Sequence, residues 1–232
     1  MKTADDKTIV RDYFNATGFD RWRRIYGDGE VNKVQLDIRQ GHQQTIDTVL
    51  GWLTADGNLA EITVGDVGCG VGSLSIPLAQ AGARVCGSDL SQKMVEEARS
   101  RAIATLGQED NPTFTVADLE GLSDRHHTIV CLDVLIHYPQ DTAAEMIAHL
   151  SSLADQRLIL SFAPKTLAYT VLKKIGDFFP GPSKATRAYL HRESDVIRIL
   201  EANGWQIQRN AMLKTRFYFS RLLEAVRRSP AA

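Results

Sequence analysis

The chain has 232 residues, of which 44% are hydrophobic, and its 27 basic and 28 acidic residues give a formal net charge of −1. This length suits one sizeable α/β domain with an elaboration and is too short for two ordinary domains. The balanced charge argues against a protein that binds nucleic acid over its whole surface. We find neither a secretory signal nor an apolar run of about 18 residues, so we expect a cytoplasmic protein, with peripheral membrane attachment left open.

The three cysteines give no sign of a bound metal. Cys69, Cys86 and Cys131 fall on or beside predicted strands, and none of them belongs to a C-x-x-C pair. We therefore expect three buried cysteines and no metal held by the protein itself.

Residues 1–60 have a mostly helical pattern, which predicts an arm that precedes the main domain. One helix is expected over residues 5–15, with Gly18 breaking it, and another over residues 34–52, where apolar side chains recur at helical spacing.

Aromatic and basic residues alternate without a regular period over residues 19–27. Three arginines stand there beside Trp22 and Tyr26. Two interpretations stay open: a lid over a flat or anionic ligand, or a surface helix whose arginines extend over the aromatic rings.

A glycine-rich turn follows the apolar run 62–67, which predicts a buried strand. Gly68, Gly70 and Gly72 stand at alternate positions before a helical stretch at 73–81. Glycines permit a tight turn and let a ligand approach the backbone, and the helix start offers free N–H groups.

Asp89 ends the next predicted strand, residues 84–89, seventeen residues after Gly72. A carboxylate at this place suits a ribose, because the diol offers two donors to two acceptor oxygens. The strand, turn, helix and strand together predict a nucleoside-binding unit.

Strands and helices alternate along residues 62–163. This order predicts a parallel sheet with right-handed crossovers and with ligands at the carboxyl ends of its strands. Further strands are expected at 113–117, 128–132 and 157–162, and further helices at 92–106, where Ser91 suits the N-cap, and at 143–153.

Residues 164–190 form a long connection after the fifth strand. Residues 164–192 carry six basic residues against one acidic residue, interleaved with apolar side chains. This segment suits an acidic apolar substrate, a membrane surface or a partner, and a plain covering helix with solvated lysines is the alternative. A helix at 193–203 and two strands at 205–212 and 216–225 follow.

The glycine turn is G-x-G-x-G and differs from the dinucleotide pattern G-x-G-x-x-G. With Asp66 before it and Asp89 after it, the turn resembles motif I of the class I S-adenosylmethionine (SAM) methyltransferases. The resemblance covers about residues 45–225. It implies a Rossmann-like α/β fold with a mostly parallel seven-stranded sheet, helices on both faces and a terminal antiparallel hairpin.

This resemblance implies a helical lid at 1–60, a methyltransferase core at 61–232 and a substrate-binding insertion at about 164–190. An acid after the third strand would accept from the adenine amino group; Asp118 fits, with a helix N-cap as its alternative role. The implied cofactor-binding residues are Asp66, Gly68, Cys69, Gly70, Gly72, Asp89, Leu90, Met94, Asp118, Leu119 and Asp133.

The flanking stretches resemble the magnesium-protoporphyrin IX O-methyltransferases of chlorophyll and bacteriochlorophyll synthesis. The residues that carry this resemblance are Tyr13-Phe14-Asn15, Gly18-Phe19-x-Arg21-Trp22, Ile25-Tyr26-Gly27, Val34-Gln35-x-Asp37-Ile38-Arg39-x-Gly41-His42, Asp133-Val134-Leu135-Ile136-His137-Tyr138-Pro139 and Phe179-Pro180-Gly181-Pro182-Ser183.

That family methylates a porphyrin propionate with SAM and releases S-adenosylhomocysteine (SAH). We expect two catalytic residues that hydrogen-bond the propionate: His137, beyond the fourth strand, and Tyr26, in the lid. A histidine at a helix start bonded to the backbone and a packing role for Tyr26 are the alternatives. The resemblance also implies magnesium that arrives with the substrate and the large subunit of magnesium chelatase as a partner. A histidine as the axial ligand of the porphyrin magnesium stays open, with His42, His137 and His191 as candidates. A ubiquinone-type O-methyltransferase and a non-catalytic SAM- or porphyrin-binding module are the alternative functions.

Overall fold

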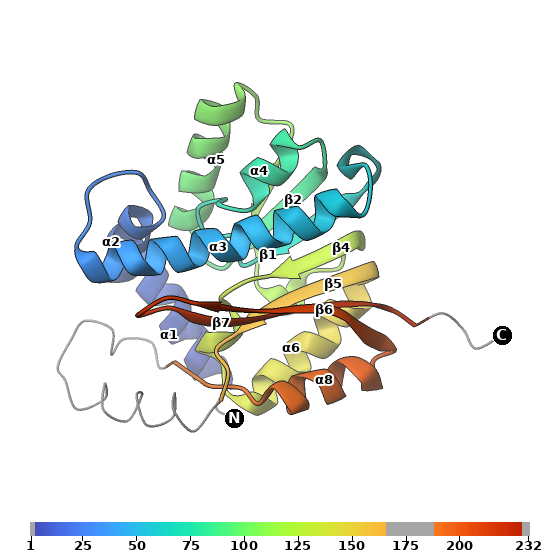
Figure 1. Ribbon diagram of the computed structural model, residues 1–232. Coiled ribbons are helices and arrows are strands. Elements are labelled where there is room, and N and C mark those ends of the chain that lie inside the picture. The colour runs from blue at the N-terminus through green and yellow to red at the C-terminus, as the bar shows by residue number, and fades with distance from the viewer. Residues whose placement is uncertain (1–2, 166–187, 229–232) are drawn as a thin grey trace.

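A computed structural model describes residues 3–165 and 188–228, and a seven-stranded sheet lies at its centre (Figure 1). The strand order is β3-β2-β1-β4-β5-β7-β6, in which β1 to β5 pair in parallel and β7 pairs antiparallel with β5 and β6. This confirms the predicted sheet with its terminal hairpin. The strands are β1 (Thr63–Val67), β2 (Arg84–Asp89), β3 (Thr113–Val116), β4 (His126–Cys131), β5 (Ala154–Phe162), β6 (Trp205–Lys214) and β7 (Phe219–Arg227).

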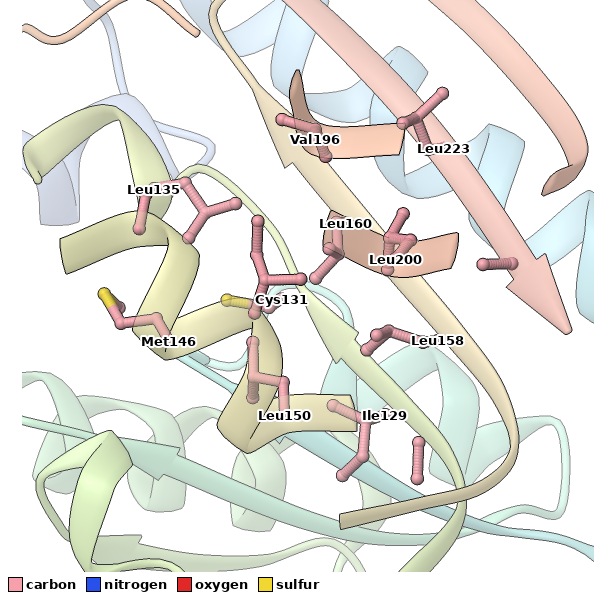
Figure 2. Close-up of a cluster of buried hydrophobic side chains, with 14 of the residues drawn as sticks. Ile129, Cys131, Leu135, Met146, Leu150, Leu158, Leu160, Val196, Leu200 and Leu223 are labelled. Atoms are coloured by element: carbon pink, nitrogen blue, oxygen red, sulfur yellow. The ribbon is translucent and has the colours of Figure 1, made fainter. Parts of the chain in front are cut away.

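Helices cover both faces of the sheet (Figure 1). One face carries α3, α4 and α5, and the other carries α6 and α8. Figure 2 shows the second face, where Met146 and Leu150 of α6 and Leu200 of α8 pack over Cys131 and Leu158. The bounds of these helices are α3 (Lys33–Ala55), α4 (Ser75–Gln80), α5 (Gln92–Leu106), α6 (Gln140–Leu153) and α8 (Glu193–Ala202).

The predicted break at Gly18 is wrong. Helix α1 (Thr3–Asn15) ends before Ala16, and Gly18 lies inside α2 (Thr17–Ile25). A Cβ on Gly18 would come within 2.5 Å of the Tyr13 ring, so glycine here lets the two helices pack closely. The chain turns by a single residue between them.

Helix α3, which lies within residues 1–60, packs on the sheet through the apolar side chains that recur at helical spacing. Its residues Ile46, Val49 and Leu53 are buried against strand residues such as Val64 and Val85. The helix starts at a capping box, in which the Asn32 side chain accepts from the backbone of Gln35 and the Gln35 side chain accepts in return.

Two further sequence expectations have different outcomes. Cys69 and Cys131 are buried, but Cys86 is exposed, because alternate residues of β2 face outward. Most of the basic insertion, residues 166–187, lies outside the described residues. None of the helices in the described part of the chain combines the length and the apolar character that crossing a bilayer requires.

Candidate functional site

A cavity of about 1100 Å³ opens at the carboxyl ends of the parallel strands. Loops after these strands form its floor, and α1, α2, α3 and the turn between β6 and β7 complete its walls. Doubly wound sheets bind ligands at this edge. The predicted site residues that line the cavity are Tyr26, Gly68, Cys69, Gly70, Asp89, Leu90, Met94, Asp118, Leu119, Asp133 and His137.

The glycine turn after β1 has the backbone that the sequence pattern requires. Gly68 has a φ of +79° and Gly70 a φ of +53°, which side chains other than glycine rarely tolerate. A Cβ on Gly68 would lie 2.1 Å from Val134. The N–H groups of Gly68 and Cys69 donate to Ser88 O at 2.8 and 3.0 Å, which fixes the turn against the end of β2.

Asp89 is oriented by two backbone groups. Its Oδ2 accepts from Gly70 N at 3.0 Å, and its Oδ1 accepts from Ser91 N at 2.8 Å. Burial raises the pKa of Asp89, while these hydrogen bonds act in the opposite direction. Each carboxylate oxygen keeps a lone pair that can accept from a ligand in the cavity.

Asp66 and Gly72 lie behind the cavity wall and are not among its lining residues. Asp66 is 3% exposed, and its Oδ2 accepts from Ser75 Oγ at 2.5 Å. Burial raises the pKa of Asp66 to about 6. This hydrogen bond joins the end of β1 to the first residue of α4, so Asp66 helps to fix the shape of the glycine turn between them.

Asp118 faces the cavity and also caps a short helical turn. Its Oδ1 accepts from Glu120 N at 3.4 Å, and its Oδ2 accepts from Lys7 of α1 at 3.2 Å. The N-cap role is therefore present, and the side chain lies at the cavity as well.

His137 ends a short helical turn after β4 and packs edge-on against Phe14, with ring centroids 5.5 Å apart. Its Nδ1 is buried and has no hydrogen-bond partner among the described residues. Burial lowers the pKa of His137 to about 4, so the imidazole is neutral at pH 7. A neutral imidazole carries one donor and one acceptor nitrogen.

Tyr26 is the residue that follows α2, and its side chain lines the cavity. Its ring stacks on His42 with centroids 4.2 Å apart. Burial raises the pKa of the Tyr26 hydroxyl well above its ordinary value, so the hydroxyl remains a donor at neutral pH.

Sequence reasoning missed a polar network around Asp133. This carboxylate accepts from His42 Nδ1 at 3.0 Å, from Tyr218 Oη at 3.0 Å and from Ser161 Oγ at 3.1 Å. Burial alone would raise the pKa of Asp133, but these hydrogen bonds outweigh burial and lower it. Asp133 also has a φ of +57°, unusual for a residue other than glycine. Nothing in the sequence pattern marked Tyr218, which was expected as an ordinary strand residue.

His191 is a poor candidate for a magnesium ligand. It is 1% exposed, and its ring nitrogens lie 2.9 Å from Gln140 Oε1 and 2.9 Å from Leu135 O. Both nitrogens therefore already have protein partners. His42 uses only its Nδ1 for Asp133, which leaves its second ring nitrogen for a ligand. Of the three candidates, His42 and His137 therefore remain. Among the residues described, no group of three His, Cys, Asp or Glu side chains is arranged to hold a metal ion.

The arm α1–α2 has features of both interpretations made from the sequence. Trp22 and Tyr26 line the cavity, while the guanidinium carbon of Arg23 lies 5.8 Å from the centre of the Phe19 ring. The arm is fastened to α5, because Arg101 donates to Tyr26 O at 2.5 Å.

Comparison with known families gives two matches along the chain. Residues 64–156 match the family model described as a methyltransferase domain. Residues 131–227 match the model described as the magnesium-protoporphyrin IX methyltransferase C-terminus.

Individual relatives match nearly the whole chain. A magnesium-protoporphyrin O-methyltransferase from Synechocystis is 67% identical over 96% of this chain and 97% of the relative. The chloroplastic magnesium protoporphyrin IX methyltransferase of Arabidopsis thaliana is 60% identical over 95% of this chain and 71% of the relative. A crystal structure of the Synechocystis magnesium protoporphyrin IX methyltransferase with bound SAH superposes with a TM-score of 0.90 at 65% identity, covering 96% of this chain and 100% of that chain. By this end-to-end similarity, the chain belongs to the magnesium-protoporphyrin IX O-methyltransferases, a family of class I SAM-dependent methyltransferases.

Proposed function

We propose that this protein transfers the methyl group of SAM to a propionate carboxylate of magnesium-protoporphyrin IX in chlorophyll biosynthesis. The products are the porphyrin monomethyl ester and SAH. The observation that carries the proposal is the 67% identity to the Synechocystis enzyme across 97% of its length. The large cavity beside the glycine turn provides space for a nucleoside and a macrocycle together.

SAM would lie across the strand ends in the order of the sheet. Asp118 and Leu119 after β3 would hold the adenine, and Asp89 after β2 would hold the ribose. The methionine part would then pass over the glycine turn toward Asp133 after β4. The other lining residues proposed to contact the cofactor are Gly68, Cys69, Gly70, Leu90 and Met94.

The chemistry asks little of a general base. A carboxylic acid with an ordinary pKa of about 4.3 is already ionised at neutral pH. An anion then attacks a sulfonium, and charge is neutralised in the transition state, so water opposes the step by solvating both ions. The protein gains most by excluding water and by aligning oxygen, methyl carbon and sulfur.

His137 and Tyr26 fit this requirement as hydrogen-bond donors. Both side chains line the cavity near the end of β4, and both are uncharged at neutral pH. We assign them the task of orienting the attacking carboxylate.

The test is an incubation of the purified protein with SAM and magnesium-protoporphyrin IX, read by mass spectrometry. We expect the porphyrin to gain one methyl group while SAH appears in equal amount. SAM binding without a methylated porphyrin would overturn the substrate assignment, and quinone-type acceptors would be tested next. SAM that is bound but never consumed would favour the non-catalytic module.

The partner and the membrane contact are proposed from the sequence alone. The basic segment 164–190 would contact the large subunit of magnesium chelatase, which would deliver the porphyrin, or an anionic membrane surface. Co-sedimentation with the chelatase subunit and with anionic vesicles, in wild type and in a variant with the lysines of this segment replaced, separates these two contacts.

A further inference from the structure

The turn between β6 and β7 brings a cation and an aromatic ring to the cavity mouth. Arg216 and Phe217 line the cavity, and both are exposed, Phe217 to 47%. The guanidinium carbon of Arg216 lies 5.4 Å from the centre of the Phe217 ring. An exposed guanidinium beside an aromatic face suits a flat ligand that carries a carboxylate.

This turn is held in place by two sets of contacts with α3. Asp37 of α3 accepts from Thr215 Oγ1 at 2.6 Å, from Phe217 N at 2.6 Å and from Arg216 N at 3.2 Å. The Tyr218 ring fills the space over Gly41, where a Cβ would lie 2.4 Å from it. These contacts give Arg216 a fixed backbone, which reduces the entropy lost when its side chain binds a ligand.

Tyr218 connects the turn to the centre of the site. Its hydroxyl donates to Asp133 at 3.0 Å, at the end of β4 where the methyl group would be transferred. The turn therefore extends from that centre to the mouth of the cavity, with Arg216 two residues from Tyr218.

Arg216 differs from the other cations that line the described part of the cavity. Lys7 is paired with Asp118 and Glu120, and Arg11 lies 3.3 Å from Asp12. Within the described residues, the Arg216 guanidinium has no carboxylate oxygen within 4.0 Å, although its charge is one of the causes that lower the pKa of the nearby Asp37. The hydrogen bond between the two residues comes from the backbone N–H of Arg216, so the guanidinium N–H groups can still donate to a ligand.

We infer that Arg216 binds the carboxylate of the second propionate, the one that is not methylated, while Phe217 packs against the edge of the macrocycle. The inference rests on the proposed function. Magnesium-protoporphyrin IX carries two propionates on neighbouring rings, so a carboxylate remains free when the first one enters the reaction centre. A second methylation would place the new ester against Arg216 and lose the ion pair. Arg216 thereby favours the diacid over the monoester as a substrate and disfavours a second methylation.

The experiment compares Arg216→Gln and Arg216→Lys with Lys214→Gln. Lys214 is an exposed cation on β6 that does not line the cavity, so its variant controls for the loss of one positive charge. Binding of magnesium-protoporphyrin IX in the presence of SAH is measured by porphyrin fluorescence. The same titration uses the analogue in which one propionate is a neutral amide. Mass spectrometry gives the ratio of diester to monoester.

We expect Arg216→Gln to weaken binding of the diacid about twofold to fivefold and to raise the diester-to-monoester ratio by a similar factor. Arg216→Lys keeps the positive charge but loses the planar guanidinium with its paired N–H donors. Its affinity for the diacid and its diester-to-monoester ratio should lie between those of wild type and Arg216→Gln. The amide analogue should bind wild type and Arg216→Gln alike, and Lys214→Gln should match wild type. SAM affinity should stay the same in all variants.

The inference is overturned if Arg216→Gln weakens the diacid and the amide equally, if it changes neither affinity, or if wild type binds both porphyrins alike. These results differ from a failure of the proposed function. A wild-type protein that prefers the diacid through Arg216 but forms no ester would refute the reaction and leave the inference standing.

Discussion

Burial shifts the pKa values of the side chains around the cavity toward the uncharged form, and neighbouring hydrogen bonds can reverse that shift. Asp133 stays ionised although it is buried, because three side chains donate to it. His137 has no such support at Nδ1 and is held neutral. A fixed anion and neutral donors thus surround the place where a carboxylate would meet a sulfonium.

Asp89→Ala should mainly weaken cofactor binding. The change removes a carboxylate that Gly70 N and Ser91 N hold in position. Because a hydrogen bond to a charged group contributes about 1.5–3 kcal/mol, the Kd for SAM should rise at least about tenfold. Calorimetric titration with SAM and turnover at saturating SAM are the measurements. A turnover that collapses while the Kd stays unchanged would contradict the assigned role.

His137→Ala and Tyr26→Phe should lower turnover more than they lower SAM affinity. Each change removes a donor proposed to orient the attacking carboxylate, and we expect a loss of about 10- to 100-fold in kcat from each. Single-turnover rates and the Kd for SAM separate the two effects. The assignment fails if SAM affinity falls while turnover at saturation holds.

Asp66→Asn should reveal a pH-dependent contribution to stability. The pKa of Asp66 is about 6 in the folded protein, above the ordinary 3.8, so the native state holds this proton more tightly than the unfolded chain. Its contribution is complete below about pH 4 and is lost as pH rises through 6. The free energy of unfolding of wild type minus that of Asp66→Asn should therefore fall by about 2–3 kcal/mol between pH 4 and 7.

Urea denaturation at several pH values measures this difference. His137, whose lowered pKa acts in the opposite direction, is present in both proteins and cancels. Asp110→Asn, which changes an exposed carboxylate, is the control. A flat difference for Asp66→Asn would refute the raised pKa.

At the scale of elements, Asn15 is one of the residues that fasten the arm α1–α2 to α5. Asn15, the last residue of α1, accepts from Ser91 Oγ at 2.8 Å and from Lys93 N at 3.4 Å. Ser91 is itself the N-cap of α5 and accepts from Met94 N. The end of α1 is thus attached to the same helix start that supports Asp89.

Asn15→Ala should loosen this arm without unfolding the core. Losing a hydrogen bond worth about 0.5–1.5 kcal/mol should speed amide exchange in α1 and α2 by about threefold to tenfold. Hydrogen exchange read by mass spectrometry measures it. Gln92→Ala, which removes only an exposed contact to Glu96, is the matched control. Equal exchange in the two variants would show that Asn15 does not hold the arm.

The elements that could be predicted from the sequence are those set by local pattern. The strand at Arg84–Asp89 and the helix at Gln92–Leu106 were expected with these bounds, because apolar runs, a glycine turn and a serine cap mark them. The break near Gly18 was misplaced, because the reason for that glycine is its packing against Tyr13. Long-range contacts leave no such local mark.

The site residues also divide into those marked by local sequence pattern and those set by long-range contacts. Glycines and acids at strand ends could be predicted, since each stands beside its own strand. The network around Asp133 could not, because Tyr218 and Asp133 are 85 residues apart and His42 and Asp133 are 91 apart. Packing of α3 and of the turn between β6 and β7 near the end of β4 brings these three side chains together, and such long-range contacts cannot be recognised in a single sequence.

At the scale of the whole molecule, a buried ionic cluster lies away from the cavity. Glu224 of β7 is fully buried and pairs with Arg209 of β6, and its Oε1 lies 3.2 Å from Arg157 Nε. Both arginines also reach Asp56, which follows α3. None of these residues lines the cavity. The cluster joins the end of α3 to three strands, and it does so outside the ligand cavity.

Glu224→Gln should therefore destabilise the fold and leave ligand binding intact. The change keeps the size of the side chain but leaves two largely buried guanidinium groups short of a charge partner, which should cost about 3 kcal/mol of unfolding free energy. Asp155→Ala is the control, because it breaks an exposed pair with Arg125 and should cost at most about 1 kcal/mol. Urea denaturation gives the two costs, and titration with SAH at a temperature where both variants are folded gives the affinity. Equal costs would mean that Glu224 contributes no more than a surface charge, and a weakened SAH affinity would mean that the cluster and the site are coupled through α3.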